Sequence, residues 1–186
     1  MRKIAAILML LLSLSGCGRE SEQLDRIVSL RNEINNASAY SFNANITLDY
    51  GDSSFNFSTK CKVDSNKNME LIITEPQSIS GISAQISGES GKLVYDDVIL
   101  AIELIADGEI TPISSPWLFT HALSGGYIST CSSDSNGCIV SFDDSYNAVQ
   151  FTVNVKFDEH GLPTFAEIIW DGKRIVSMTV SDFVLL

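Results

Sequence analysis

The sequence predicts a mainly β protein with a strongly curved antiparallel sheet, a half-barrel of about ten or eleven strands covered by two helices. Several segments alternate apolar and polar residues with period two, turn residues separate them at a spacing of roughly 8–12 residues, and only two segments have helical periodicity. One-sided alternation is typical of antiparallel strands with one face on a core and the other on water. The sheet must therefore wrap around the helices or close on itself and enclose a cavity.

The first 17 residues have the layout of an export signal for a lipid-modified protein. Arg2 and Lys3 precede an apolar run over residues 4–12, and residues 14–17 read Leu-Ser-Gly-Cys. This ending resembles the bacterial lipobox, in which the peptide is cut before the cysteine and the cysteine is acylated. A transmembrane anchor is the alternative, but residues 4–14 as a helix would span about 16 Å of a hydrocarbon core of about 30 Å. We expect residues 1–16 to be a signal peptide and Cys17 to be the lipidation site.

The predicted lipobox also determines the expected domain organisation and cellular location. Residues 17–21 are predicted to be a lipidated tether, and residues 22–186 a single half-barrel domain. The net charge of −11 becomes −13 when Arg2 and Lys3 leave with the signal. Such a surface repels nucleic-acid phosphates and anionic headgroups, so we expect no nucleic-acid partner and attachment through acyl chains alone. The predicted location is the extracytoplasmic face of the cell membrane, with a lipid anchor.

Helical and strand segments follow in a clear order. Residues 22–37 predict an amphipathic helix, since apolar residues recur mostly at spacings of three and four: Leu24, Ile27, Val28, Leu30 and Ile34. The clearest strand patterns lie over residues 40–50, 55–63, 82–86 and 149–157, and Thr59 is the one polar residue on the apolar face of the second. Turn signals lie at residues 50–52, 64–68, 89–91, 136–137, 159–163 and 171–172.

A second helix is predicted in the middle of the chain. The segment around residues 114–123 offers a serine as N-cap candidate (Ser114 or Ser115), a proline at the first helical position (Pro116), and Gly125-Gly126 after its end. Its apolar residues Trp117 and Leu118 lie on or near one face with Leu123. A short buried helix and a lid over an apolar concavity explain this segment equally well.

Residues on the shared apolar face are candidates for lining a hydrophobic cavity, together with those of the mid-chain helix. These candidates are Phe42, Ile46, Leu48, Phe55, Phe57, Ile82, Ile86, Trp117, Leu118, Phe151, Val153 and Val155.

Two cysteines flank a turn-rich segment. Cys131 and Cys138 enclose residues 132–137, which end in Asn-Gly between two β-prone runs. In an exported protein they could join the end of a hairpin by a disulfide, provided that their Cα atoms lie within about 7 Å; free thiols are the alternative. Cys61 has no obvious partner. We expect no metal site, because His121 and His160 have no cysteine or histidine at ligand spacing.

The motifs of common catalytic sites are missing. No Gly-x-Ser-x-Gly elbow, Walker loop or His-Glu-x-x-His sequence occurs. The acidic pairs Asp96-Asp97 and Asp143-Asp144 are poor catalytic dyads, since sequence neighbours on a strand point to opposite faces, and they are best interpreted as solvated turn residues. We therefore expect a protein that is not an enzyme, with no catalytic residue and no cofactor.

These features together resemble the lipoprotein-carrier half-barrel superfamily of bacterial lipoprotein-sorting proteins. The resemblance rests on the lipobox, the N-terminal helix, the one-sided sheet and the mid-chain helix. Residues 157–163, Phe-Asp-Glu-His-Gly-Leu-Pro, are similar to a turn common in that superfamily, as is the hairpin at residues 170–173. Residues 75–82 are similar to relatives in Gram-positive spore-formers, among them a lipoprotein that assists a peptidoglycan amidase during germination.

The resemblance implies an eleven-strand half-barrel whose apolar interior takes acyl chains or a hydrophobic segment of a partner. Two functions remain open. The first is a non-enzymatic, membrane-anchored lipoprotein that binds a lipid or an acylated segment in the cavity. The alternative is an envelope scaffold or activator that docks on a protein such as a cell-wall amidase through a sheet edge or face.

The anchor can be tested directly. Cys17→Ser should release the protein from membranes and stop the incorporation of labelled acyl chains, because the acylated thiol is lost. Membrane fractionation and metabolic labelling measure both effects. Unchanged fractionation would rule out the lipid anchor.

Overall fold

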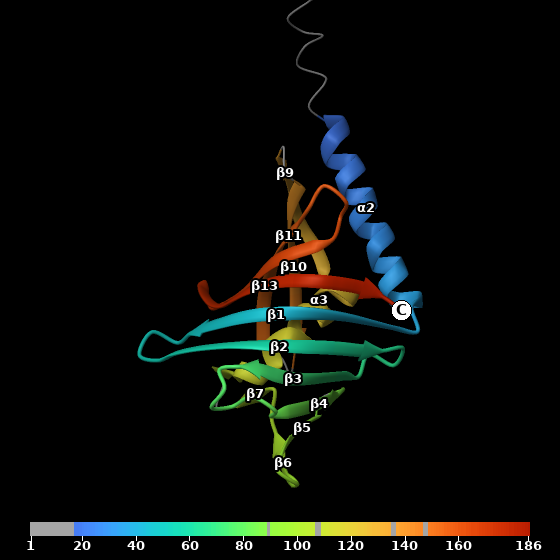
Figure 1. The fold of residues 1–186 in the computed structure, drawn as a ribbon. Helices are drawn as coiled ribbons and strands as arrows, with labels where there is room; N and C mark the ends of the chain where they lie inside the picture. The colour runs from blue at the N-terminus through green and yellow to red at the C-terminus, as the bar shows by residue number, and fades with distance from the viewer. Residues whose placement is uncertain (1–16, 89, 107–108, 135–136, 147–148) are drawn as a thin grey trace, which may run out of the picture.

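The computed structural model describes residues 17–88, 90–106, 109–134, 137–146 and 149–186. It confirms the predicted fold class: an antiparallel sheet of eleven strands with an N-terminal and a mid-chain helix (Figure 1). The elements are α2 (Cys17–Asn36), β1 (Ala39–Asp49), β2 (Ser54–Asp64), β3 (Met69–Glu75), β4 (Ser83–Ser87), β5 (Ser90–Tyr95), β6 (Val98–Ile102), β7 (Ile105–Ala106), β8 (Glu109–Ile110), η1 (Pro112–Ser114), α3 (Ser115–Gly125), β9 (Tyr127–Asp134), β10 (Gly137–Tyr146), β11 (Val149–Phe157), β12 (Pro163–Trp170) and β13 (Lys173–Leu185).

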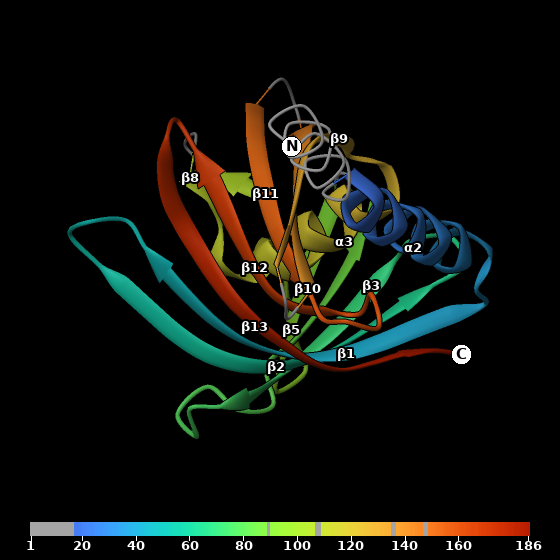
Figure 2. The same ribbon diagram turned by 90° about the horizontal axis from the view of Figure 1, so that it is seen from above.

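The large sheet has the strand order β6-β5-β4-β3-β2-β1-β13-β12-β11-β10-β9, and β7 and β8 form a separate pair. Within the large sheet, strands that are consecutive in the chain are neighbours, and β1 pairs with β13 in addition. This pairing brings the two ends of the domain to the middle of the sheet and leaves β6 and β9 at its edges. Figure 2 shows the sheet curving around α3, with α2 beside the open side.

Strict alternation of side chains places the core on the concave face. On β1 the residues Tyr40, Phe42, Ala44, Ile46 and Leu48 are all buried, and the serine, asparagine and threonine residues between them are not. Because successive side chains on a strand point to opposite faces, this pattern assigns one apolar face to the interior. The predicted alternation is therefore confirmed for this strand.

One polar side chain of the core has a specific partner. Thr59, which interrupts the apolar face of β2, is buried, and its hydroxyl donates a hydrogen bond to the Ile72 carbonyl at 2.9 Å. The cost of burying a hydroxyl is offset when it is hydrogen-bonded in this way.

The N-terminal helix is longer than predicted. It begins at Cys17 instead of residue 22, so the backbone of the predicted tether is helical. Its residues Ile27, Leu30 and Ile34 are buried, whereas Val28 is exposed. The Lys67 ammonium group, from the turn between β2 and β3, donates a hydrogen bond to the Ile34 carbonyl at 2.9 Å, one of the carbonyls that the end of a helix leaves unpaired. No helix in the described part of the chain has both the length and the apolar composition to cross a membrane.

The mid-chain helix α3 follows a turn of 3₁₀ helix and is buried along most of its length. Ser114 occupies the N-cap position of α3, as the sequence predicts for one of the two serines, but its hydroxyl donates to the Thr111 carbonyl and makes no capping hydrogen bond. The other end of α3 is held by Arg31 of α2, whose guanidinium donates to the carbonyls of Leu123 and Gly126, each at 2.8 Å. A cation is favourable there because the carbonyl end of a helix carries partial negative charge.

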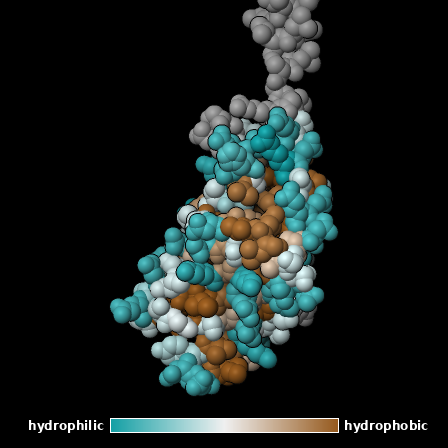
Figure 3. All heavy atoms as spheres, turned by 45° about the vertical axis from the view of Figure 1, so that its right-hand side comes forward, coloured by the Kyte–Doolittle hydropathy of each residue, from teal (hydrophilic) through white to brown (hydrophobic). Residues whose placement is uncertain are grey.

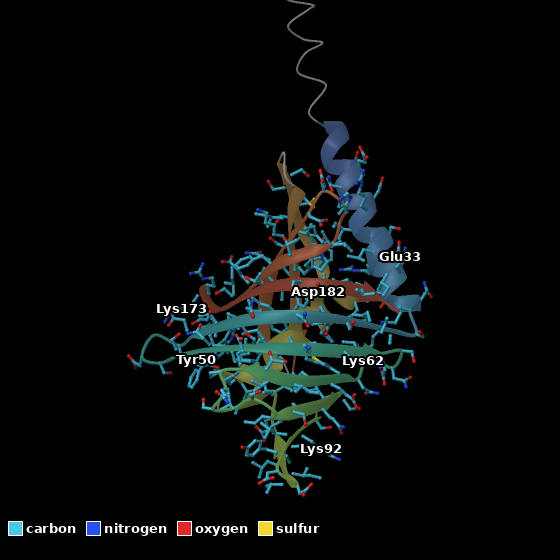
Figure 4. The ribbon with its side chains drawn as sticks, viewed as in Figure 1. Glu33, Tyr50, Lys62, Lys92, Lys173 and Asp182 are labelled. Atoms are coloured by element: carbon cyan, nitrogen blue, oxygen red, sulfur yellow. The ribbon has the colours of Figure 1, made fainter. Side chains whose placement is uncertain are left out.

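Many of the charged side chains lie on the outside of this arrangement. Figure 4 labels Glu33 on α2, Lys62 on β2, Lys92 on β5 and Asp182 on β13, and all four residues are exposed. The large sheet therefore separates an apolar concave face from a polar outer face.

The covering role of α3 leads to a stability prediction. Phe119 is fully buried and its ring meets the ring of Phe42 edge to face, with centroids 5.5 Å apart. Phe119→Ala should lower the free energy of unfolding by about 3–5 kcal/mol, as measured by urea denaturation. The control Tyr127→Ala, at an exposed ring, should change it by no more than about 0.5 kcal/mol. Equal effects of the two variants would contradict the buried position of α3.

Candidate functional site

The predicted cavity residues lie together in the core. Ten of the twelve are buried: Phe42, Ile46, Leu48, Phe57, Ile86, Trp117, Leu118, Phe151, Val153 and Val155. Ile82 is partly buried and packs against them. These side chains belong to one buried apolar cluster, which also contains residues of α3.

Phe55 is the exception, because 46% of it is exposed. It follows the alternation of β2, but β3 pairs with β2 only from Ser58 onward. The beginning of β2 therefore extends past its neighbouring strand, and the Phe55 ring packs on Tyr50 with centroids 6.1 Å apart. Phe55, a candidate for lining the cavity, therefore lies outside the buried core.

Apolar residues instead reach the surface at the β5–β6 hairpin. Val98, Ile99 and Leu100 of β6 are 56%, 65% and 55% exposed, and Tyr95 of β5 is 50% exposed. Figure 3 shows apolar side chains gathered at the end of the molecule away from its N-terminus, where Figure 1 places β6. We call these four residues the β6 patch.

The hairpin keeps the register of the sheet while it extends past the core. Leu100 lies opposite Leu93, and Ile102 lies opposite Gly91. A Cβ atom at position 91 would lie 2.6 Å from Ile102 Cγ1, so glycine lets the Ile102 side chain cross this position and pack on the core. Val98 and Leu100 continue the same face outward, beyond the cover of α3.

The backbone of β6 is also open on one side. β6 ends the strand order, so its far edge has no neighbouring strand among the described residues. Natural edge strands are commonly protected by charged residues, proline or a bulge, but β6 reads Val-Ile-Leu-Ala-Ile. An unprotected apolar edge is a template for pairing with another strand. The sequence shows this composition, but only the topology reveals that the strand lies at an edge.

A partly buried polar contact joins α3 to β10. His121 Nδ1 lies 2.7 Å from Asp144 Oδ2, and the imidazole stacks on Trp117 with ring centroids 4.9 Å apart. The Asp144 side chain is only 10% exposed, so its interpretation as a solvated turn residue is wrong. Sequence reasoning missed the pair because its members lie 23 residues apart, with no local signal that links them.

The electrostatics of this contact favour a charged histidine. The hydrogen bond to Asp144 raises the pKa of His121, while partial burial opposes that rise. Arg31 is the other nearby cation, and its guanidinium lies over the Phe142 ring at 5.3 Å. Burial lowers the pKa of Arg31, and Asp144 acts in the opposite direction. Both cations thus face the one carboxylate of Asp144.

The cysteines differ from the expected arrangement. The predicted disulfide between Cys131 and Cys138 is not formed in the structure. Cys131 lies opposite Val140 and Cys138 lies opposite Ser133, so the two cysteines occupy diagonal positions and not facing ones.

Cys61 is buried in the core, and desolvation raises the pKa of its thiol to about 12. The Cys17 side chain lies outside the described atoms, so its acylation stays a prediction.

No protein-family model and no curated protein matches the sequence. Solved structures do match at the level of the whole chain. A LolA superfamily protein from Nitrosomonas europaea has 16% identity and a TM-score of 0.48, covering 87% of this chain and 93% of its own. The Mycobacterium tuberculosis lipoprotein LppX has 12% identity and a TM-score of 0.43, covering 88% and 96%.

A third match is a chain in the structure of the CwlD amidase from Clostridioides difficile in complex with the GerS lipoprotein. It has 11% identity and a TM-score of 0.43, covering 88% of this chain and 96% of that chain. At these identities the likeness concerns the fold alone.

The contact between His121 and Asp144 predicts a pH-dependent stability. Because the folded state raises the pKa of His121, the stabilisation is fully present below about pH 6.5, the ordinary histidine value, and is lost as the pH rises through the folded-state pKa. His121→Gln should therefore lower the free energy of unfolding by up to about 1 kcal/mol at pH 5.5 and by much less at pH 9.

Urea denaturation at both pH values measures this difference. The control His160→Gln changes a histidine whose side chain is 75% exposed and should have little effect at either pH. A His121→Gln effect that is equal at pH 5.5 and pH 9 would argue against an ionic contact.

Proposed function

We propose that this chain is a lipid-anchored extracytoplasmic docking protein, without enzymatic activity, that binds an extended segment of another envelope protein along β6. The observation that carries the proposal is the β6 patch: an edge strand with three residues more than half exposed and no charged side chain within it. Such a strand offers backbone hydrogen bonds for affinity and apolar side chains for specificity.

The concave face supports the docking function over the lipid-binding one. Its apolar side chains form one buried cluster with those of α3, and the ends of α3 are held by η1 and by Arg31. A ligand in the interior would have to break these contacts, whereas a strand that pairs with β6 would break none.

The position of β6 supports a protein partner over the membrane surface. Figure 1 shows β6 at the end of the molecule opposite the beginning of α2, where Cys17 lies. An anchor at Cys17 would therefore direct β6 away from the bilayer. Asp96 and Asp97 also close the hairpin at one end of β6, and carboxylates there are repelled by anionic headgroups.

The charges beside β6 define the chemistry of the partner segment. Asp96 and Asp97 precede the strand and Glu103 follows it, all three residues being exposed. Lys92 of β5, opposite Ala101, is the neighbouring cation, so the carboxylates predominate. A complementary segment is extended, apolar in its middle, and flanked by lysine or arginine. Complementary charges of this kind mainly increase the rate of association and fix the register.

Crosslinking in cells tests this function. A photo-crosslinking amino acid at Ala101, in the full anchored chain, should give a protein adduct identified by mass spectrometry. Ile99→Lys should lower the adduct yield at least tenfold, since a charged edge residue disfavours strand pairing.

Ile72→Lys is the matched control, because Ile72 is also exposed, at 51%, but lies on β3 inside the sheet. It should leave the adduct yield unchanged. Equal losses in the two variants, or an acyl lipid as the species bound to the purified wild-type chain in native mass spectrometry, would contradict docking through β6.

A further inference from the structure

The outer face of the sheet carries a groove that the docking function does not use. It has a volume of about 740 Å³ and lies between the outer side chains of the central strands and the loop that follows β3. Figure 2 shows this loop, after Glu75, extending beyond the sheet on the side away from α3. The groove thus lies mainly on the outer face of the sheet, and none of its lining residues belongs to β6.

Strand register arranges the floor of the groove as a row across five neighbouring strands. Phe165 of β12 lies opposite Thr179 of β13, Thr179 opposite Asn45 of β1, Asn45 opposite Ser58 of β2, and Ser58 opposite Glu75 of β3. All five line the groove. With neighbouring strands about 4.8 Å apart, the row is roughly 19 Å long, with an aromatic ring at one end and a carboxylate at the other.

A second row of hydroxyl and amide groups runs beside the first. Ser177, Thr47 and Asn56 are cross-strand neighbours, and all three line the groove. The Thr47 hydroxyl donates to Asn56 Oδ1 at 2.6 Å, which leaves the amide N–H groups of Asn56 as donors. Within the described part of the chain, the side chains of Asn45, Ser177 and Thr179 have no hydrogen-bond partner.

This lining excludes several ligand classes. Lysine and arginine are missing from it, so phosphate groups and nucleic acids have no counter-charge. Glu75 is its only ionisable side chain, which is too few ligands for a cation site. An extended peptide cannot add to the floor, because the strands there already pair on both sides. The apolar residues of the lining are Ile46, Phe57, Pro76 and Phe165, and the first two are buried in the core, which leaves little apolar surface for an acyl chain.

From this geometry we infer that the outer groove binds a neutral oligosaccharide. Asparagine, serine and threonine side chains both donate and accept hydrogen bonds, which is what a chain of hydroxyl groups requires. The Phe165 ring offers an apolar surface for the carbon-bound hydrogens of a pyranose ring. A row of polar groups at a regular strand spacing suits a linear ligand with a repeating unit. The extended groove therefore takes several sugar units.

The proposal is tested with soluble oligosaccharides of known composition. We would titrate the purified signal-free chain with chitotetraose and with cellotetraose and follow backbone amide signals by NMR. At least one sugar should shift signals of residues 45, 47, 56, 58, 165, 177 and 179, and those of β6 should stay in place. Asn45→Ala and Phe165→Ala should each weaken binding at least tenfold.

Asn43→Ala is the matched control, because Asn43 lies on the same strand and the same outer face but does not line the groove. It should bind the sugar like the wild type, and circular dichroism should show that all variants are folded. The inference is overturned if neither sugar binds at millimolar concentration or if the signal shifts lie elsewhere. It is independent of docking, since it requires neither β6 nor the anchor.

Discussion

The apolar side chains of the large sheet gather on one concave face, and that face must be covered by something. In this chain α3 covers it, with Trp117, Leu118 and Phe119 buried against the strands. Because these side chains are already buried in one cluster, the half-barrel does not require an apolar ligand to remove them from water. Binding surfaces must then lie where the sheet extends beyond its cover, at β6, or on the polar outer face. Both proposals follow from this single packing constraint.

The helical cover is held by polar contacts as well as by apolar burial. Arg31 binds the last carbonyls of α3 from α2, and His121 binds Asp144 of β10 from α3. These contacts connect the N-terminal helix, the mid-chain helix and the sheet. They make displacement of α3 costly, because leaving such buried polar groups unpaired carries its own penalty. The closed interior is therefore supported by charge as well as by packing.

Local patterns predicted a large part of the fold. Period-two alternation located β11 at the observed bounds 149–157, and turn chemistry separated the strands. The alternation and turn patterns gave less where the position of a residue depends on strands that are distant in the sequence. Phe55 follows the alternation but lies past the end of β3, and Cys131 and Cys138 flank a turn but occupy diagonal positions. The edge position of β6 and the row from Phe165 to Glu75 depend on strand order and register, which a single sequence does not contain.

Hydrogen–deuterium exchange on the signal-free chain tests the covering role of α3 most directly. Amide exchange reports local opening, whose free energy ranges from near zero at edges to the global value in the core. If α3 is a fixed cover, its amides and those of β1 and β13 should exchange together at the slowest rates, while amides of β6 exchange much faster. Fast exchange throughout α3, at rates like those of β6, would show a helix that opens readily and would contradict the closed interior on which the account depends.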